Sequence, residues 1–291
     1  MSRISDKLRA EFKASDDIRD AGLTTPPDIL RRDDIVYGDD PKWQALDVYT
    51  PRAGDGPWPV IVSVHGGGWV YGDKERSQYY CMSLAQRGFG VVNFTYRLAP
   101  EHRFPAPLED ANLVFHWLRG HAAEYGLDDR HVFAVGDSAG AHLLALYACV
   151  CTNPEYAARF DFAPPAGFVP TAVALNCGVY ERDVSEGAQG RSLMEDFLPG
   201  GITPESLALT NPILHVTPAF PPAFVMTSTG DYLRAQAPVM AAKLDAMDVP
   251  HVSRLYGDHD TRPGHVFHCD MRDPVGKLCN DEECDFFKRF I

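Results

Sequence analysis

The sequence lacks the features that define several large classes of protein. No run of five or more basic residues occurs, and the 291-residue chain has a formal net charge of −13. Such a charge repels a phosphate backbone, so we expect no nucleic-acid partner. No apolar stretch approaches the roughly 20 residues of a membrane-spanning helix, so we expect no membrane insertion. The hydrophobic share of 45 % argues against disorder and indicates a globular protein.

The sequence also lacks the cysteine patterns of a disulfide framework or a compact zinc motif. Its seven cysteines are scattered without a C-x-x-C pair, and Cys149 and Cys151 lie in an apolar stretch with helical spacing. We interpret them as reduced thiols of a cytoplasmic protein. The N-terminal sequence MSRISDKLRAEFKASDD is charged throughout and has no apolar core, so we expect no secretory signal.

Apolar segments of two kinds alternate along the chain, separated by 23 prolines and 24 glycines. Runs rich in Val and Ile predict buried strands, and runs with helical spacing predict helices. This alternation is typical of an α/β fold with a mainly parallel sheet and helices on both faces. The predicted strands are 58–65, 89–96, 131–136, 171–178, 223–229 and 251–257, and the predicted helices are 74–88, 108–126, 139–151, about 234–247 and 281–291.

Two segments, 1–34 and 181–210, do not fit the alternation of strand and helix. The chain has no internal repeat and no low-complexity linker, so we expect a single domain over residues 1–291. A long insertion at the strand ends of such a sheet lies where it would cover an active site. We therefore expect both segments to contribute to a cap.

The sequence GDSAG, residues 136–140, lies between a predicted strand and a predicted helix. This is the context of a nucleophile elbow, a sharp turn that presents a serine hydroxyl above the sheet. Gly136 and Gly140 relieve the crowding beside such a turn. We therefore predict that Ser138 is a catalytic nucleophile.

The sequence HGGGW, residues 65–69, follows the strand predicted at 58–65. Three consecutive glycines cost conformational entropy and allow backbone N–H groups to crowd around one point. Such donors stabilise the oxyanion of a tetrahedral intermediate, and losing one costs about 2.7–4 kcal/mol. We assign the N–H groups of Gly66, Gly67 and Ala139 to an oxyanion hole, and expect a structural role for His65.

A serine nucleophile needs a base, and that base needs an acid that orients it. In the nucleophile-elbow fold the chain order is serine, acid, histidine. Asp231 follows the strand predicted at 223–229 and fits the acid. The strand at 251–257 leads into YGDHDTRPGHVFHCD, which contains His259, His265 and His268. The order of elements requires one base here without choosing among the three.

Together these segments resemble the hormone-sensitive-lipase-like α/β hydrolases, the bacterial family IV esterases. The resemblance rests on HGGGW (65–69), YRLAPEHRFPAPLED (96–110), GDSAG (136–140), GDYLR (230–234) and HVF (265–267). It implies the α/β-hydrolase fold, a partly helical cap and no cofactor. It also implies His265 as the base, and we assign Trp69 and Gly68 to the substrate pocket. Two departures are Tyr232, which stands where the family often has proline, and the long loop 257–264.

The leading hypothesis is a serine carboxylic-ester hydrolase that acts on short-acyl esters through an acyl-enzyme. One alternative is an arylformamidase or related amidase with the same triad. Another is a non-catalytic small-ligand receptor on a hydrolase scaffold. A third is a zinc site formed by His259, His265 and His268 with Asp260, but zinc would take the base from the triad, so we expect no metal. The resemblance also allows a homodimer through edge strands.

Overall fold

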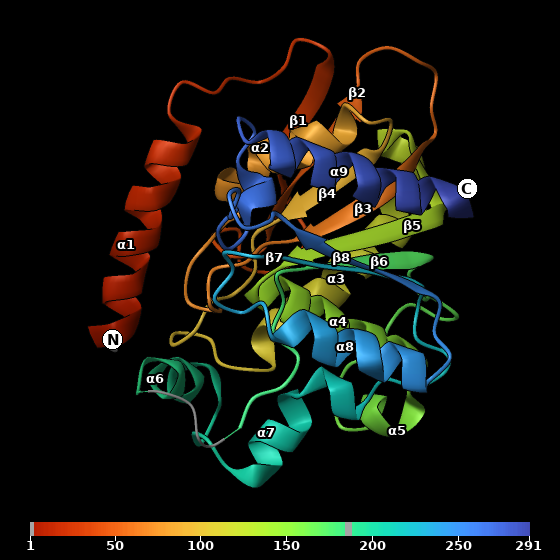
Figure 1. The fold of residues 1–291 in the computed structure, drawn as a ribbon. Coiled ribbons are helices and arrows are strands. Elements are labelled where there is room, and N and C mark those ends of the chain that lie inside the picture. Colours follow the sequence, from red (N-terminus) through yellow and green to blue (C-terminus); the bar gives the residue numbers. More distant parts are fainter. Residues whose placement is uncertain (1–2, 184–187) are drawn as a thin grey trace.

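The computed structural model describes residues 3–183 and 188–291, which form a twisted eight-stranded sheet with helices on both faces (Figure 1). The strand order is β1-β2-β4-β3-β5-β6-β7-β8. Strand β2 runs antiparallel to β1 and β4, and the remaining pairs are parallel. The strands are β1 (Ile29–Val36), β2 (Ala45–Pro51), β3 (Trp58–Val64), β4 (Gly90–Phe94), β5 (Leu127–Asp137), β6 (Ala172–Asn176), β7 (Ala223–Ser228) and β8 (His251–Tyr256).

The mainly parallel sheet confirms the sequence prediction, with β1 and β2 added at one edge. Strand β1, ILRRDDIV, carries four charged residues and is only partly buried, so it lacks the continuous apolar run of a central strand. Because residues 29–34 belong to this strand, the boundary expected for the N-terminal cap segment, residue 34, lies too far along the chain.

The helices divide between the two faces of the sheet, with α2 and α9 on one face and α3, α4 and α8 on the other (Figure 1). Alternate residues of β3 supply both cores: Val60 and Val62 face α3 and α4, while Ile61 faces α2 and α9. The helices are α1 (Arg3–Asp20), α2 (Lys74–Ala85), α3 (Ala106–His121), α4 (Ala139–Thr152), α5 (Pro154–Ala157), α6 (Ala188–Phe197), α7 (Pro204–Thr210), α8 (Gln236–Ala246) and α9 (Pro274–Phe287).

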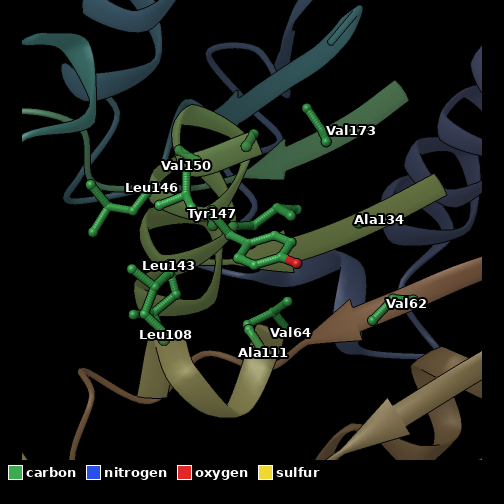
Figure 2. Close-up of a cluster of buried hydrophobic side chains, with 14 of the residues drawn as sticks. Val62, Val64, Leu108, Ala111, Ala134, Leu143, Leu146, Tyr147, Val150 and Val173 are labelled. Carbon is green, nitrogen blue, oxygen red and sulfur yellow. The ribbon is translucent and has the colours of Figure 1, made fainter. Parts of the chain in front are cut away.

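Helix α4 lies at the centre of the larger core (Figure 2). Its side chains pack between α3 and the strands, and Figure 2 shows Leu143, Leu146, Tyr147 and Val150 beside residues of α3, β3, β5 and β6. Almost the whole of α4 is buried, which agrees with its apolar sequence AGAHLLALYACV. The first turn of this buried helix is therefore held in a fixed position relative to the sheet.

The two segments expected to form a cap meet in space. Helix α1 contacts α6, and both lie beside the sheet on the same side of the molecule (Figure 1). Arg9 of α1 donates to the carbonyl oxygens of Val70 and Ala99 and pairs with Glu101. Residues 184–187 of the expected cap lie outside the described residues. In the described ranges, no helix is long and apolar enough to cross a membrane.

Candidate active site

Ser138 lies in the tight turn between β5 and α4, as the GDSAG sequence predicts. Its backbone has φ 52° and ψ −117°, a strained conformation for a non-glycine residue. A Cβ atom at Gly136 would lie 2.6 Å from the Gly140 carbonyl oxygen, and one at Gly140 would lie 2.0 Å from the Val64 carbonyl oxygen. Only glycine fits at both positions, so the two glycines allow the turn that directs the hydroxyl toward His265.

His265 lies between Ser138 and Asp231, and it makes one hydrogen bond to each. The Ser138 Oγ to His265 Nε2 distance is 2.9 Å. The His265 Nδ1 to Asp231 Oδ1 distance is 2.8 Å. A neutral imidazole in this position accepts the serine proton at Nε2 and donates Nδ1–H to the carboxylate. The structure thus brings together the three residues that the sequence selected.

The Asp231 carboxylate is buried but well supplied with donors. It accepts hydrogen bonds from His265, from the Leu233 N–H at 2.8 Å and from the Thr227 hydroxyl at 2.9 Å. Burial alone would raise the pKa of Asp231, but these hydrogen bonds outweigh it and hold the pKa below its usual range. Asp231 therefore remains an anion that can orient and stabilise the imidazolium form of His265.

The three histidines of the 256–270 segment lie in different environments. The side chain of His259 is 100 % exposed and pairs with Asp260, at 3.0 Å. His268 is fully buried, and burial lowers its pKa to about 3. The side chain of His265 is 16 % exposed. The structure does not bring the three together, so they do not form the zinc site that was considered as an alternative.

The glycine-rich loop approaches the nucleophile, but its first glycine is already occupied. The Gly66 N–H donates to Asp137 Oδ1 at 3.0 Å, so the prediction that Gly66 belongs to the oxyanion hole is wrong. Gly67 and Gly68 have φ of 118° and 60°. Across the described residues, the N–H groups of Gly67, Gly68 and Ala139 make no hydrogen bond. Ala139 is the first residue of α4, where an N–H has no partner within the helix.

Trp69, which the sequence assigned to the substrate pocket, is a packing residue in this structure. It is 1 % exposed, its ring stacks on Phe197 at 4.8 Å, and its Nε1–H donates to His142. A direct contact with substrate therefore stays a prediction for Trp69. A Cβ atom at Gly68 would lie 3.7 Å from Leu193 of α6, so the second expected cap segment reaches the glycine loop.

The long loop 257–264 is tied to the turn that carries Asp231. The buried Ser228 hydroxyl donates to the Pro263 carbonyl oxygen at 2.7 Å, with the Gly264 carbonyl oxygen at 3.2 Å. The Gly230 N–H also donates to Pro263, at 3.1 Å. These bonds end directly before His265, so they hold the base against its acid.

Sequence reasoning missed several polar residues around the triad, notably Asp137, Cys177, Thr227 and Ser228. Each lies at or just beyond the carboxyl end of a parallel strand, where sites of such sheets are found. Their position at the carboxyl ends of the predicted strands was the sequence signal that could have identified them. Within the described residues, four of the six non-glycine residues with positive φ lie here: Trp69, Ser138, Cys177 and Val266. Backbone strain is thus concentrated at the site.

Comparisons with known proteins agree with this geometry. A protein-family model, BD-FAE, matches residues 46–244. Esterase LipC of Mycobacterium tuberculosis is 31 % identical over 255 residues, which span 84 % of this chain and 61 % of LipC. Carboxylesterase NlhH of the same species is 30 % identical over 274 residues, which span 86 % of this chain and 83 % of NlhH.

Solved structures show the same fold. An esterase B from Lactobacillus rhamnosis, inhibited by a C4-C4 SN3 tributyrin phosphonate, has a TM-score of 0.88 and 28 % identity, and the match covers 99 % of this chain and 95 % of that one. This confirms the predicted α/β-hydrolase fold. The chain therefore belongs to the BD-FAE family and, among α/β hydrolases, to the hormone-sensitive-lipase-like, or bacterial family IV, esterases.

Proposed function

We propose that this protein is a serine carboxylic-ester hydrolase. The observation that carries the proposal is the unbroken hydrogen-bond chain from Ser138 through His265 to Asp231, with distances of 2.9 and 2.8 Å. Nucleophile and base lie within proton-transfer distance before any substrate is bound. The curated relatives LipC and NlhH carry the names esterase and carboxylesterase, which agrees with this chemistry.

In the first half of the reaction, Ser138 Oγ attacks the ester carbonyl carbon while its proton passes to His265 Nε2. The Asp231 anion stabilises the resulting imidazolium. The carbonyl oxygen becomes an oxyanion, which the N–H groups of Gly67, Gly68 and Ala139 would hold. The tetrahedral intermediate collapses, His265 returns the proton to the leaving alcohol, and an acyl group remains on Ser138.

In the second half, water replaces the alcohol. His265 Nε2 removes a proton from the water as its oxygen attacks the acyl carbon, and the same N–H groups hold the second oxyanion. Collapse releases the carboxylic acid, and the proton returns to Ser138 Oγ. The sum is one ester and one water converted to one acid and one alcohol.

We propose short acyl groups as the substrate class. The stacked rings of Trp69 and Phe197 and the Leu193 side chain fill space beside the glycine loop. We expect these side chains to limit the depth available to a long acyl chain. The tributyrin phosphonate in the related esterase B carries C4 chains, which fits the same expectation.

The cap over the site is also a proposal. Its support is that Arg9 of α1 donates to Val70, directly after the HGGGW segment, and that Leu193 of α6 lies 3.7 Å from where a Cβ atom would stand at Gly68. We further propose a cytoplasmic enzyme, because all seven cysteines are free thiols. The homodimer stays a prediction, which light scattering after size-exclusion chromatography would test.

The direct test is hydrolysis of p-nitrophenyl acetate, butyrate, octanoate and an aryl formamide by wild type and by Ser138→Ala. We expect wild type to prefer acetate or butyrate, and Ser138→Ala to lose about 10⁶-fold in kcat. A Ser138→Ala protein with wild-type rates would refute the proposal. Faster cleavage of the formamide than of every ester would favour the amidase alternative.

A further inference from the structure

Cys177 lies directly beyond the carboxyl end of β6, beneath the acid and the base of the triad. It is 1 % exposed and has φ 48°, a left-handed conformation that is uncommon for a non-glycine residue. Its N–H donates to the Met226 carbonyl oxygen at 2.8 Å, and its Sγ lies 3.9 Å from Met226 Sδ. The backbone of Cys177 is thus held by its neighbour strand, and its thiol lies against Met226.

The thiol belongs to a cluster of potential metal ligands. Cys177 Sγ, a carboxylate oxygen of Asp231 and a ring nitrogen of His265 all lie within 4.8 Å of one another. Across residues 3–183 and 188–291, this is the one group of three His, Cys, Asp or Glu side chains so placed. It differs from the histidine set considered from the sequence, and only His265 is common to both.

The cluster has the chemistry of a zinc site. Zinc binds Cys sulfur at about 2.3 Å, His nitrogen at about 2.0–2.1 Å and carboxylate oxygen at about 2.0–2.2 Å, in tetrahedral geometry. These bond lengths place the ligand atoms roughly 3.4–3.6 Å apart. The Asp231 and His265 atoms, now 2.8 Å apart, would separate slightly, and the sulfur would move inward. The neighbouring Met226 sulfur makes the site favourable for soft ions.

We propose that Cys177, Asp231 and His265 form an inhibitory binding site for Zn²⁺ and softer divalent ions such as Cd²⁺. On binding, the thiol releases one proton to solvent, and the proton of His265 moves from Nδ1 to Nε2, so that Nδ1 can bind the ion and Nε2 can no longer accept the Ser138 proton. The ion then takes the place of the Asp231–His265 hydrogen bond, so the imidazole no longer serves Ser138. Metal binding itself does not depend on esterase activity, whereas its inhibitory effect rests on the proposed function.

The burial of the cluster determines how an ion enters it. Cys177 and the Asp231 side chain are buried, and His265 is the one ligand with an exposed edge. The exposed ring of Tyr232 lies 4.5 Å from the His265 ring. An ion can reach the thiol only when the imidazole swings aside. Inhibition should therefore develop slowly after mixing, unlike the immediate effect of ions on exposed groups.

The activity experiment compares wild type with Cys177→Ser and Cys177→Ala, each normalised to its own rate without metal. We expect time-dependent inhibition of wild type by Zn²⁺, reversal by EDTA, and an increase of at least tenfold in the half-inhibiting concentration for both variants. Cys151→Ser, which removes the one partly exposed cysteine, and Cys269→Ser, which removes a thiol 3.6 Å from His268, serve as controls. Equal half-inhibiting concentrations in wild type and Cys177 variants would overturn the proposal.

A second readout needs no activity. Cd²⁺ bound to thiolate gives an ultraviolet charge-transfer band, which we expect in wild type and not in the Cys177 variants. If neither Cys177 variant folds, the His265→Ala protein tests the metal site instead, because the His265 side chain is partly exposed and its removal should be tolerated. The Cd²⁺ band of this variant should require at least tenfold more Cd²⁺ than the band of wild type. A band without any hydrolysis would refute the proposed function alone. Hydrolysis with an unchanged band in these variants would refute the metal site alone.

Discussion

His265 and His268 belong to one short segment, yet their environments are opposite. His265 has a partner at each ring nitrogen and an edge open to the surface. His268 is fully buried, and in the described structure its Nδ1 has no hydrogen-bond partner. Val266, which follows His265, has a left-handed backbone conformation and leads into the 3₁₀ helix Phe267–Cys269, which contains His268. The chain therefore changes direction between the two histidines. The unusual conformation of Val266 thus places His265 as the base of the triad and His268 as a packing residue of the core.

Two buried carboxylates differ in the same way: Asp231, which bonds to His265, and Glu283, which bonds to Tyr80, whose ring packs against His268. Burial of Asp231 is outweighed by its hydrogen bonds, and its pKa is lowered. Burial of Glu283 is not outweighed by its bonds from Asn176 and Tyr80, and its pKa is raised to about 7. Both are buried acids with hydrogen-bond donors. Burial therefore does not distinguish the reactive carboxylate. Asp231 differs from Glu283 in its partner, the partly exposed imidazole of His265, which can accept a proton and become a cation.

The strongest test of this comparison removes each imidazole in turn. His265→Ala should lower kcat by about 10⁶-fold and leave the stability nearly unchanged. His268→Ala should lower the free energy of unfolding by about 2 kcal/mol, because it leaves a hole in the core, while folded molecules remain active. Steady-state kinetics and urea unfolding on both variants measure the two effects. An inactive but stable His268→Ala protein would contradict the assignment of His268 as a packing residue.

The next largest effect concerns the acid. Asp231→Asn keeps the shape of the side chain but no longer favours the tautomer that accepts the Ser138 proton. We expect a loss of about 10⁴-fold in kcat. A loss below tenfold would show that Asp231 is not the orienting acid. Asp260, an exposed carboxylate that pairs with His259, is the matched control, and Asp260→Asn should retain wild-type kinetics.

Glu283 offers a test through the pH dependence of stability. The folded protein holds the Glu283 proton up to about pH 7, whereas the unfolded chain releases it near the ordinary value of 4.5. Between these pH values Glu283 binds its proton in the folded state and not in the unfolded state, so its contribution to the free energy of unfolding falls as pH rises. Each pKa unit corresponds to about 1.4 kcal/mol, so this fall is at most about 3.5 kcal/mol.

Glu283→Gln should remove the contribution of Glu283 to the pH dependence of the free energy of unfolding. Urea unfolding of wild type and variant at pH 5 and pH 8 measures this contribution. Asp137, whose pKa is raised by burial to about 6, and the buried His65, His142 and His268, whose pKa values burial lowers, contribute equally in both proteins, so the readout is the difference between wild type and variant. Identical slopes in the two proteins would contradict the raised pKa of Glu283.

The smallest effect tests the long loop before His265. Ser228→Ala removes the buried hydroxyl that holds Pro263, at a cost of about 1 kcal/mol. If this bond positions His265, kcat should fall about fivefold while KM changes little. Thr229→Ala is the control, because the Thr229 hydroxyl makes only a 3.4 Å contact with the Thr261 carbonyl oxygen at the surface. Equal effects of the two substitutions would exclude a positioning role for Ser228.

Much of the fold followed from the sequence, because central strands and buried helices have distinctive apolar patterns. Strands β3 to β8 and helix α4 were predicted within a few residues of their observed bounds, apart from an earlier start of β5. Strand β1 was not predicted because its four charged residues interrupt the apolar pattern of a strand. Strand β2 was not predicted because only pairing with its neighbours distinguishes it from a loop. The antiparallel pairing of β1 and β2 is a tertiary property that local composition does not encode.

At the site, the sequence selected Ser138, Asp231 and His265 from strand order and short motifs. It could not distinguish Gly66 from Gly68, since adjacent glycines are equivalent until the backbone shows which N–H is already bonded. It likewise could not place Cys177, because the contact with Asp231 and His265 joins loops after β6, β7 and β8. Such convergence is a property of the sheet and not of any one segment.

The central claim is that Ser138 is the single activated nucleophile. Treatment with a fluorophosphonate ester, followed by intact-mass measurement and peptide mapping, tests it most directly. The account predicts one adduct per chain, located on Ser138, absent from Ser138→Ala and strongly slowed in His265→Ala. No adduct on the wild-type protein, or an adduct on another residue, would contradict it.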